Sequence, residues 1–355
     1  MRLRLLPVVA LLAASCAAPP DRPAFTAVDL PATPVALAAD GSALLVGLRR
    51  DGEPLVPGLV RRTPDGKLAE VPVRGASPYG LLATWQSIAT DNGTYVAIGG
   101  ERGGAHGNVR WSVWTGSAAG IVEKPQGFST FGGWGAGDLI DAVTTPVGPA
   151  LIGSWESERV GLDVAVWTAD GDIWNRQLSA GTALESASDA LGFATAASGF
   201  GQGIVVAGWE LGDRIRPVVW RSTSGNTGWT RTPLPDAGAT GTATAVRCWA
   251  SSCAAVGQVD GRLAVWRLAD DTWTRLGGEP PISVSDKDKL AAPVEHDGQP
   301  AVFIADGGRV KHLTHDGTGW HVKEIGGPTG SVSATAQLGD DVFLVADNRL
   351  WRGAS

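Results

Sequence analysis

Residues 204–235, IVVAGWELGDRIRPVVWRSTSGNTGWTRTPLP, contain the pattern that decides the fold of this chain. An apolar run closes on Gly208, a second run ends at Trp220, and a third begins at Trp229. Glycine, serine, asparagine and aspartate between the runs favour turns. Because the runs are short and rich in β-branched residues, the stretch predicts successive strands joined by turns.

The same pattern recurs seven times along the chain. The apolar runs ALLVG, YVAIG, ALIG, IVVAG, CAAVG, AVFIA and VFLVA close on Gly47, Gly99, Gly153, Gly208, Gly257, Ala305 and Ala346. These residues are 52, 54, 55, 49, 48 and 41 positions apart, a spacing typical of the blades of a β-propeller. Because one small sheet cannot bury its two faces alone, closing the copies into a ring buries them. We expect an all-β, seven-bladed β-propeller.

The two ends of the repeat region indicate how the ring closes. The last repeat stops near Trp351 and lacks a fourth strand. Residues 25–31, FTAVDLP, resemble the fourth strand of another repeat, WTRTPLP at residues 229–235. We therefore expect a single propeller domain over residues 25–355, in which the N-terminal strand completes the last blade and covers an exposed edge.

Residues 1–16 have the composition of an export signal. Arg2 and Arg4 precede a short apolar run, and small residues follow up to Cys16. The apolar run is shorter than the roughly 20 residues that span a bilayer. Residues 13–16, AASC, resemble the lipobox of bacterial lipoproteins, and this resemblance implies that Cys16 carries acyl chains.

Residues 17–24, AAPPDRPA, are expected to form a proline-rich tether between the lipid and the domain. The export signal and the lipobox resemblance at Cys16 together imply that the chain lies on the outer side of a bacterial cell membrane. Ordinary secretion with cleavage near Ala18 is the alternative.

The charge balance excludes one class of partner. Removing the signal takes away Arg2 and Arg4, so 29 basic residues become 27 against 36 acidic residues, a net charge of −9. Phosphate backbones are repelled by such a chain, and the sequence has no Lys/Arg-rich run to oppose this. We expect no nucleic-acid partner, and no membrane contact other than the lipid anchor.

Two cysteines remain in the domain. Cys248 and Cys253 flank the four-residue segment 249–252 at the first hairpin of the fifth repeat. Opposed residues of antiparallel strands have Cα atoms about 4.5 to 5.5 Å apart, which a disulfide bridges. We expect this disulfide, as a local constraint of an exported domain.

A second resemblance lies in the turn before the fourth strand. Residues 222–229, STSGNTGW, resemble the Asp-box of BNR-repeat proteins, with Ser224 in place of the aspartate and Asn226 in place of a glycine. The turns that contain Asp170 and Asp316 keep the aspartate and are one residue shorter. The family includes sialidases, photosystem assembly factors and binding propellers, so the resemblance implies a fold and not one activity.

We expect the functional site on one face of blades one to four. From each closing small residue to the end of the third strand there are 15, 15, 14 and 12 residues in these blades, against 9, 8 and 5 in the others. We call these longer loops, with the crossovers between blades beside them, the canopy. Tryptophan beside a charged residue suits the stacking of a sugar ring or the binding of a cation, whereas a solvated loop is the alternative. The candidate ligand-binding residues are Trp85, Glu101, Arg102, Trp134, Trp155, Glu156, Trp209 and Glu210.

Other kinds of site have little support in the sequence. His312, His315 and His321 are close together, but alternation along an extended segment separates the first two. No Walker loop, GxSxG elbow or HExxH motif is present. We expect no metal and no cofactor.

These observations lead to one functional hypothesis and two alternatives. The first is a monomeric, lipid-anchored propeller that binds an envelope protein or glycan without catalysis. A glycan-active hydrolase or lyase is the alternative, with Glu156 and Glu210 as acids about 5 to 9.5 Å apart. It would lack the sialidase site, since neither Tyr79 nor Tyr95 lies in a matching motif. A purely structural assembly factor is the third.

Overall fold

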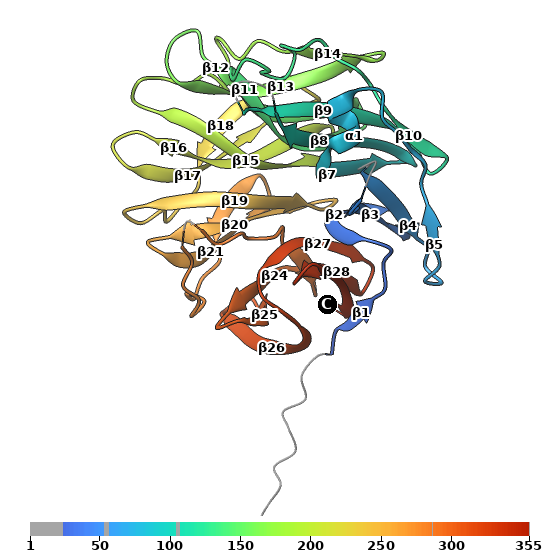
Figure 1. Cartoon of the computed structure of the whole chain (residues 1–355). Coiled ribbons are helices and arrows are strands. Elements are labelled where there is room, and N and C mark those ends of the chain that lie inside the picture. Colours follow the sequence, from blue (N-terminus) through green and yellow to red (C-terminus); the bar gives the residue numbers. More distant parts are fainter. Residues whose placement is uncertain (1–23, 53–56, 104–106, 286, 355) are drawn as a thin grey trace, which may run out of the picture.

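The computed structural model of the chain describes residues 24–52, 57–103, 107–285 and 287–354. The described residues form seven sheets that follow one another around the molecule (Figure 1), which confirms the expected seven-bladed propeller. The inner strand of the first blade contacts the inner strands of both the second and the last blade. The ring is therefore closed.

Each blade is an antiparallel sheet with four strands ordered from the axis outward. The innermost strands are β2 (Thr33–Asp40), β7 (Thr84–Asp91), β11 (Gly137–Thr145), β15 (Leu191–Phe200), β19 (Gly241–Cys248), β23 (Val294–His296) and β27 (Val332–Leu338). The second strands are β3 (Ala43–Arg49), β8 (Thr94–Arg102), β12 (Gly148–Glu156), β16 (Gly203–Leu211), β20 (Cys253–Val259), β24 (Gln299–Asp306) and β28 (Asp341–Ala346).

The third and fourth strands form the outer half of each blade. The third strands are β4 (Gly58–Arg62), β9 (Val109–Ser117), β13 (Leu162–Asp170), β17 (Ile215–Arg221), β21 (Arg262–Ala269), β25 (Arg309–His315) and β29 (Arg349–Ala354). The fourth strands are β5 (Leu68–Glu70), β10 (Gly120–Glu123), β14 (Ile173–Arg176), β18 (Thr230–Pro233), β22 (Thr272–Arg275), β26 (Trp320–Thr329) and β1 (Thr26–Val28). A short strand β6 (Val73–Arg74) pairs in parallel with β10 and widens the second blade.

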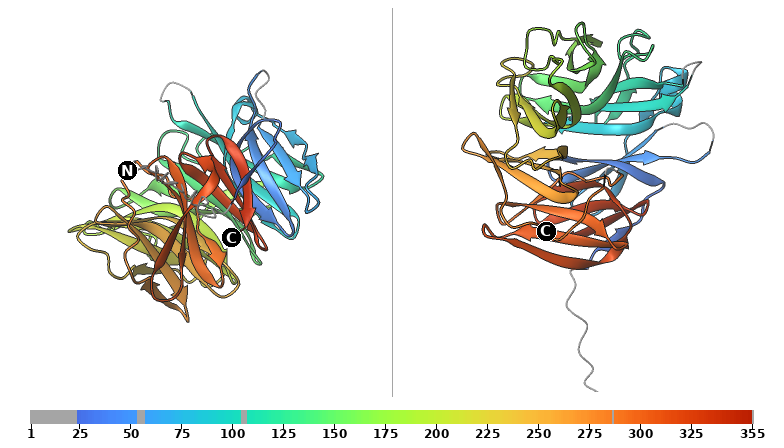
Figure 2. Two further views of the ribbon diagram at one scale, coloured as in Figure 1. Left: turned by 90° about the horizontal axis from the view of Figure 1, so that it is seen from below. Right: turned by 90° about the vertical axis from the view of Figure 1, so that its left-hand side faces the viewer.

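The N-terminal strand completes the last blade, as predicted. β1 pairs antiparallel with β29, with Thr26 opposite Arg352 and Val28 opposite Leu350. Figure 2 shows the N-terminal strand, in blue, beside the C-terminal blade, in red. Phe25 is buried and packs edge to face on Phe303, with ring centroids 5.5 Å apart.

The hydrophobic core lies between the blades. Each cluster of buried apolar side chains combines residues of two neighbouring blades, including a cluster that joins the seventh blade to the first. Trp114, Trp167, Trp220 and Trp266 are fully buried in these clusters. The repeated tryptophans at the ends of the third strands thus have a packing role, because large rings fill the space between sheets.

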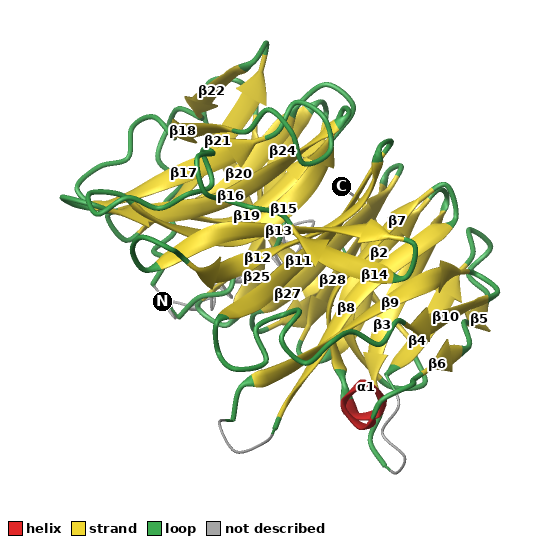
Figure 3. Cartoon of the chain, turned by 90° about the horizontal axis from the view of Figure 1, so that it is seen from above, coloured by secondary structure: helices red, strands yellow, loops and turns green. Residues whose placement is uncertain are grey.

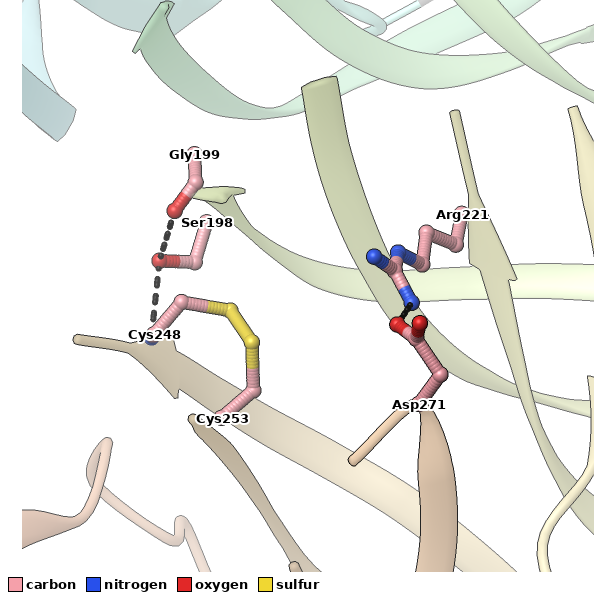
Figure 4. The surroundings of a disulfide bond; sticks show 6 residues. All are labelled: Ser198, Gly199, Arg221, Cys248, Cys253 and Asp271. Atoms are coloured by element: carbon pink, nitrogen blue, oxygen red, sulfur yellow. Dashed lines mark hydrogen bonds and ion pairs between the residues drawn. A yellow bond between two sulfur atoms is a disulfide. The ribbon is translucent and has the colours of Figure 1, made fainter. Parts of the chain in front are cut away.

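The predicted disulfide joins Cys248 to Cys253. Their Cα atoms are 3.9 Å apart, closer than we expected, because a hydrogen bond from the Trp249 N–H to the Ser252 carbonyl (2.8 Å) closes the hairpin tightly. The Cys248 N–H also donates to the hydroxyl of Ser198 in the neighbouring blade, at 3.0 Å (Figure 4). The disulfide therefore joins the end of β19 to β20, and the hydrogen bond to Ser198 holds it beside β15.

Among the residues that the structure describes, helical structure is confined to α1 (Pro78–Leu82), which Figure 3 draws in red. In that part of the chain no helix has the length and apolar character needed to cross a membrane. The predicted export signal at residues 1–16 and most of the predicted tether lie outside the residues that the structure describes.

Candidate functional site

A cavity of about 220 Å³ opens in the canopy of the second blade. The start of β9 forms its floor, and the crossovers that enter and leave the blade form its walls. We call it the Arg110 cavity and define it by the residues Tyr79, Arg110, Trp111, Glu123, Phe128 and Phe131.

Arg110 is the central residue of this cavity. Its side chain lies between two rings, with the guanidinium carbon 4.6 Å from the centroid of Phe128 and 6.0 Å from that of Tyr79. One amine group donates to the carbonyl of Gly133, whereas the Nε atom has no hydrogen-bond partner. Arg110 is only 8% exposed, and within the described part of the chain no carboxylate lies within 4 Å of it. Burying a cation without a counter-ion costs free energy. This arrangement therefore favours binding of a ligand that brings a hydrogen-bond acceptor to Arg110.

Glu123 holds the crossover that carries Tyr79. Its buried carboxylate accepts the backbone N–H groups of Ala76 and Ser77, at 2.6 and 2.8 Å, and the Ser77 hydroxyl at 2.6 Å. Ser77 also caps α1 by accepting the N–H of Gly80 at 2.9 Å. A Cβ on Gly80 would lie 2.1 Å from the carboxylate, so only glycine fits there. The charge of Glu123 is therefore matched by these donors rather than by Arg110.

Trp134 extends the site onto the surface. It is 70% exposed, and its ring packs edge to face on Phe128 with centroids 4.8 Å apart. Trp111, the residue after Arg110 in β9, lines the cavity and donates its indole N–H to Asp138 at 3.0 Å. One indole therefore lies in the cavity and the other adjoins it through Phe128, an arrangement suited to a ligand with both a flat face and a hydrogen-bond acceptor.

Glu101 and Arg102 lie close to this site, as the sequence predicted them to lie in the canopy. They line an adjoining cavity of about 350 Å³ that shares Trp111 with the Arg110 cavity. Arg102 donates to the Gly107 carbonyl at 3.2 Å. Both side chains can reach a ligand that passes over Trp111.

Trp85 reaches the wall of the same adjoining cavity but is 3% exposed. Its indole N–H donates to the Gly58 carbonyl at 2.7 Å, and its ring packs edge to face on Trp114. We therefore correct its expected role: the side chain belongs to the core between the first two blades.

The third blade places its candidates differently. Trp155 is half-buried against Trp167, and the guanidinium of Arg176 lies over its ring at 4.5 Å from the centroid. Because one face of the indole is already covered by a cation, the ring offers less surface for stacking. Glu156, at the end of β12, is exposed.

The fourth blade turns its carboxylate inward. Glu210 is 4% exposed and lies between two arginines, with Arg216 at 3.1 Å and Arg231 on its other oxygen. Trp209 stacks on Phe193 with ring centroids 4.1 Å apart. Glu210 is therefore corrected both as a ligand contact and as a catalytic acid, because it is buried and each carboxylate oxygen is already paired with a half-buried guanidinium. Of the two acids that the hydrolase alternative names, Glu156 is the one that is exposed.

The sequence could not reveal Arg110 and Glu123 as site residues. The rings on either side of Arg110 come from positions 31 residues before it and 18 residues after it, in two different crossovers. No local motif joins such distant positions. As for metals, no three His, Cys, Asp or Glu side chains converge among the described residues.

Solved structures share this architecture at low sequence identity. The chain is similar to YCF48 bound to D1 peptide, with 12% identity, a TM-score of 0.56 and coverage of 94% of this chain and 100% of that one. It is similar to polysaccharide lyase Uly1, with 13% identity, a TM-score of 0.50 and coverage of 91% and 90%. A puromycin-hydrolyzing peptidase of Mycobacterium tuberculosis gives 10% identity, a TM-score of 0.53 and coverage of 93% of this chain and 55% of that one.

At these identities the similarity shows the propeller fold alone. No protein-family model matches the sequence, and no curated protein matches it either.

Proposed function

We propose that this chain is a binding propeller, anchored through Cys16 on the outer side of a bacterial membrane, whose canopy captures an envelope glycan or protein. The observation that carries the proposal is the pairing of Arg110, a buried cation without a carboxylate partner in the described part of the chain, with the exposed ring of Trp134. A ligand would place a polar acceptor in the Arg110 cavity and a flat group on Trp134.

The size of the cavity limits what enters it. At about 220 Å³ it is smaller than the roughly 300 to 1,000 Å³ of sites that enclose a whole small molecule. A single sugar unit or side chain of a longer ligand suits this volume, while the rest of the ligand lies across Trp111 and Trp134. This favours recognition of a polymer over enclosure of a free metabolite.

The comparisons are compatible with a binding role. Among proteins of similar fold, YCF48 is bound to a D1 peptide and Uly1 is a polysaccharide lyase. We also propose that the chain is related to BNR-repeat proteins, and the turn that contains Asp316 supports this resemblance. There, Asp316 accepts the N–H groups of Thr318 and Gly319 at 2.8 and 2.9 Å. The hydroxyl of Thr318 and the imidazole of His321 also bond to this carboxylate, each at 2.7 Å. These two side chains first, and then the backbone N–H groups, hold the pKa of the Asp316 carboxyl well below its usual value.

Replacing Trp134 with alanine is expected to weaken ligand capture about tenfold to thirtyfold, since truncating an aromatic anchor of an interface commonly costs about 2 kcal/mol. The measurement is co-sedimentation with purified cell-wall polysaccharide and, separately, pull-down of an extract of envelope proteins. Leu178→Ala is the matched control, because Leu178 is as exposed as Trp134 but has no part in the site, whereas Trp134 packs on Phe128, which lines the Arg110 cavity. If the Trp134 variant captures as much of each material as wild type, the canopy site is rejected.

Cys16→Ser is expected to abolish acylation and move the protein from the membrane fraction to the soluble fraction. The physical reason is that the acyl chains supply the membrane affinity of the proposed anchor. Metabolic labelling with a fatty-acid analogue, followed by fractionation, measures both effects. A variant that remains membrane-bound without label would contradict the proposed anchor.

A further inference from the structure

A channel runs along the axis of the propeller. Two cavities, of about 700 and 310 Å³, are lined by the innermost strands and share lining residues, so they adjoin one another along the axis. The larger cavity also contacts the hairpin turns near Asp91, Gly201 and Gly339, which join the first and second strands of their blades. This is the face opposite the canopy, so the channel is separate from the Arg110 cavity.

Arg247 lies where the two cavities meet. Of the charged residues that the structure describes, it is the one that lines both. Its guanidinium donates to the carbonyl of Pro293 at 2.9 Å and to that of Thr335 at 2.6 Å. It thereby joins the fifth blade to the sixth and the seventh.

These two bonds do not use all of the hydrogen-bonding capacity of Arg247. A guanidinium has five N–H donors, of which two serve the carbonyls. None of the described carboxylates lies within 4 Å of it to balance the charge. Burial lowers the pKa of Arg247 to about 10, so the group is still protonated at neutral pH. The side chain is enclosed by the blades, yet part of its surface faces the channel.

Three acidic residues line the two cavities, Asp91 and Glu295 in the larger and Asp141 in the smaller, and none of them forms an ion pair with Arg247 among the described residues. Asp141 lines the smaller cavity, and its carboxylate accepts the N–H groups of Ala142 and Ala197, at 3.1 and 2.9 Å, and the hydroxyl of Ser87. Burial raises the pKa of Asp141 to about 6, which keeps the group partly neutral in mildly acidic solution. Burial is also the one cause that lowers the pKa of Arg247, as expected for a cation with no carboxylate close by.

We propose that the axial channel binds a small oxyanion, a carboxylate or a phosphate, at Arg247. The free N–H groups of the guanidinium would form charge-assisted hydrogen bonds with the anion, in the planar geometry that suits oxyanions. The larger cavity, at about 700 Å³, has the volume of a small-molecule site, so an organic acid or phosphate ester can enter. This site does not depend on the proposed canopy function.

The neighbouring residue, Cys248, holds the backbone of Arg247 in place. Cys248 is bonded to Cys253 and donates its N–H to Ser198, which also lines both cavities. Figure 4 shows this attachment of the strand to the adjacent blade. A guanidinium held in this way loses little freedom when it binds an anion.

The test is a calorimetric titration of the propeller domain with sodium acetate and, separately, with inorganic phosphate, at constant ionic strength. At least one of the two is expected to bind saturably to one site. The affinity should fall tenfold or more in Arg247→Gln and less in Arg247→Lys, which keeps the charge but loses the planar fork. Binding of acetate alone or of phosphate alone supports the site and identifies the class of oxyanion.

Arg267→Gln is the matched control. Arg267 also belongs to the fifth blade and also bonds to the sixth, through Gln299 and Gly298, but it lines neither cavity. It should bind the probe as wild type does. Equal losses in the two variants, or no saturable binding of either probe to the folded wild type, would overturn the proposal.

A second measurement keeps the proposal testable if Arg247→Gln does not fold. Wild-type crystals soaked in selenate and, separately, in bromoacetate should show an anomalous peak beside the Arg247 guanidinium for the class of oxyanion that the site binds. The absence of a peak in the channel from both soaks would count against the site as strongly as a failed titration.

Discussion

A chain that begins at Pro31 is expected to lose about 4 kcal/mol or more of stability and to aggregate. The deletion removes β1 and Phe25, which packs on Phe303 and donates its backbone N–H to Gly326 at 2.9 Å. Loss of a buried phenylalanine alone costs about 3 to 5 kcal/mol. The edge of β29 becomes free to pair with another molecule. The melting temperature should fall by about 10 °C, measured by calorimetry, with oligomers seen by light scattering.

The local structure supports this large effect. Gly353 leaves the space that the Phe25 ring occupies, since a Cβ there would lie 2.6 Å from the ring. A chain that begins at Ala24 is the control, because it keeps every strand of the last blade, and it should melt as the longer chain does. A monomeric Pro31 chain with an unchanged melting temperature would show that β1 does not close the ring.

The fold could be predicted because its determinants repeat. Each blade has an apolar run that closes on a small residue, and five of the seven have a tryptophan at the end of the third strand, so seven weak signals reinforce one another. The closing strand was predictable as well, because residues 25–31 resemble residues 229–235. The disulfide followed from a spacing that is local in the sequence, and the structure confirms it.

The site was predictable only in part. Trp134 was singled out and is exposed, because long crossovers with aromatic residues belong to the surface. Glu210 was misassigned because it follows Trp209 in an apparent loop, whereas β16 continues to Leu211 and the sequence does not show which face a strand residue occupies. Its partner Arg231 is 21 positions away, in β18. Contacts between strands of this kind leave no local pattern.

Replacing Glu210 with alanine is expected to destabilise the domain by about 3 to 5 kcal/mol and to lower its melting temperature by about 10 °C. The carboxylate forms ion pairs with Arg216 and Arg231, so its removal leaves two cations side by side in the fourth blade. The Nε atoms of both arginines already lack partners, which makes a further loss harder to compensate. Urea and thermal unfolding measure the change.

Two further variants separate this structural role from a catalytic one. Glu156→Ala should change stability by less than about 0.5 kcal/mol, because Glu156 occupies the matching end of β12 but is exposed. Glu210→Gln keeps the shape of the side chain and loses its charge, so it should fall between wild type and Glu210→Ala. An acid used for catalysis would give the opposite pattern, since its removal would abolish turnover and leave the stability of the fold unchanged. Equal melting temperatures for wild type and Glu210→Ala would therefore refute the buried ion pairs and return Glu210 to the list of candidate acids.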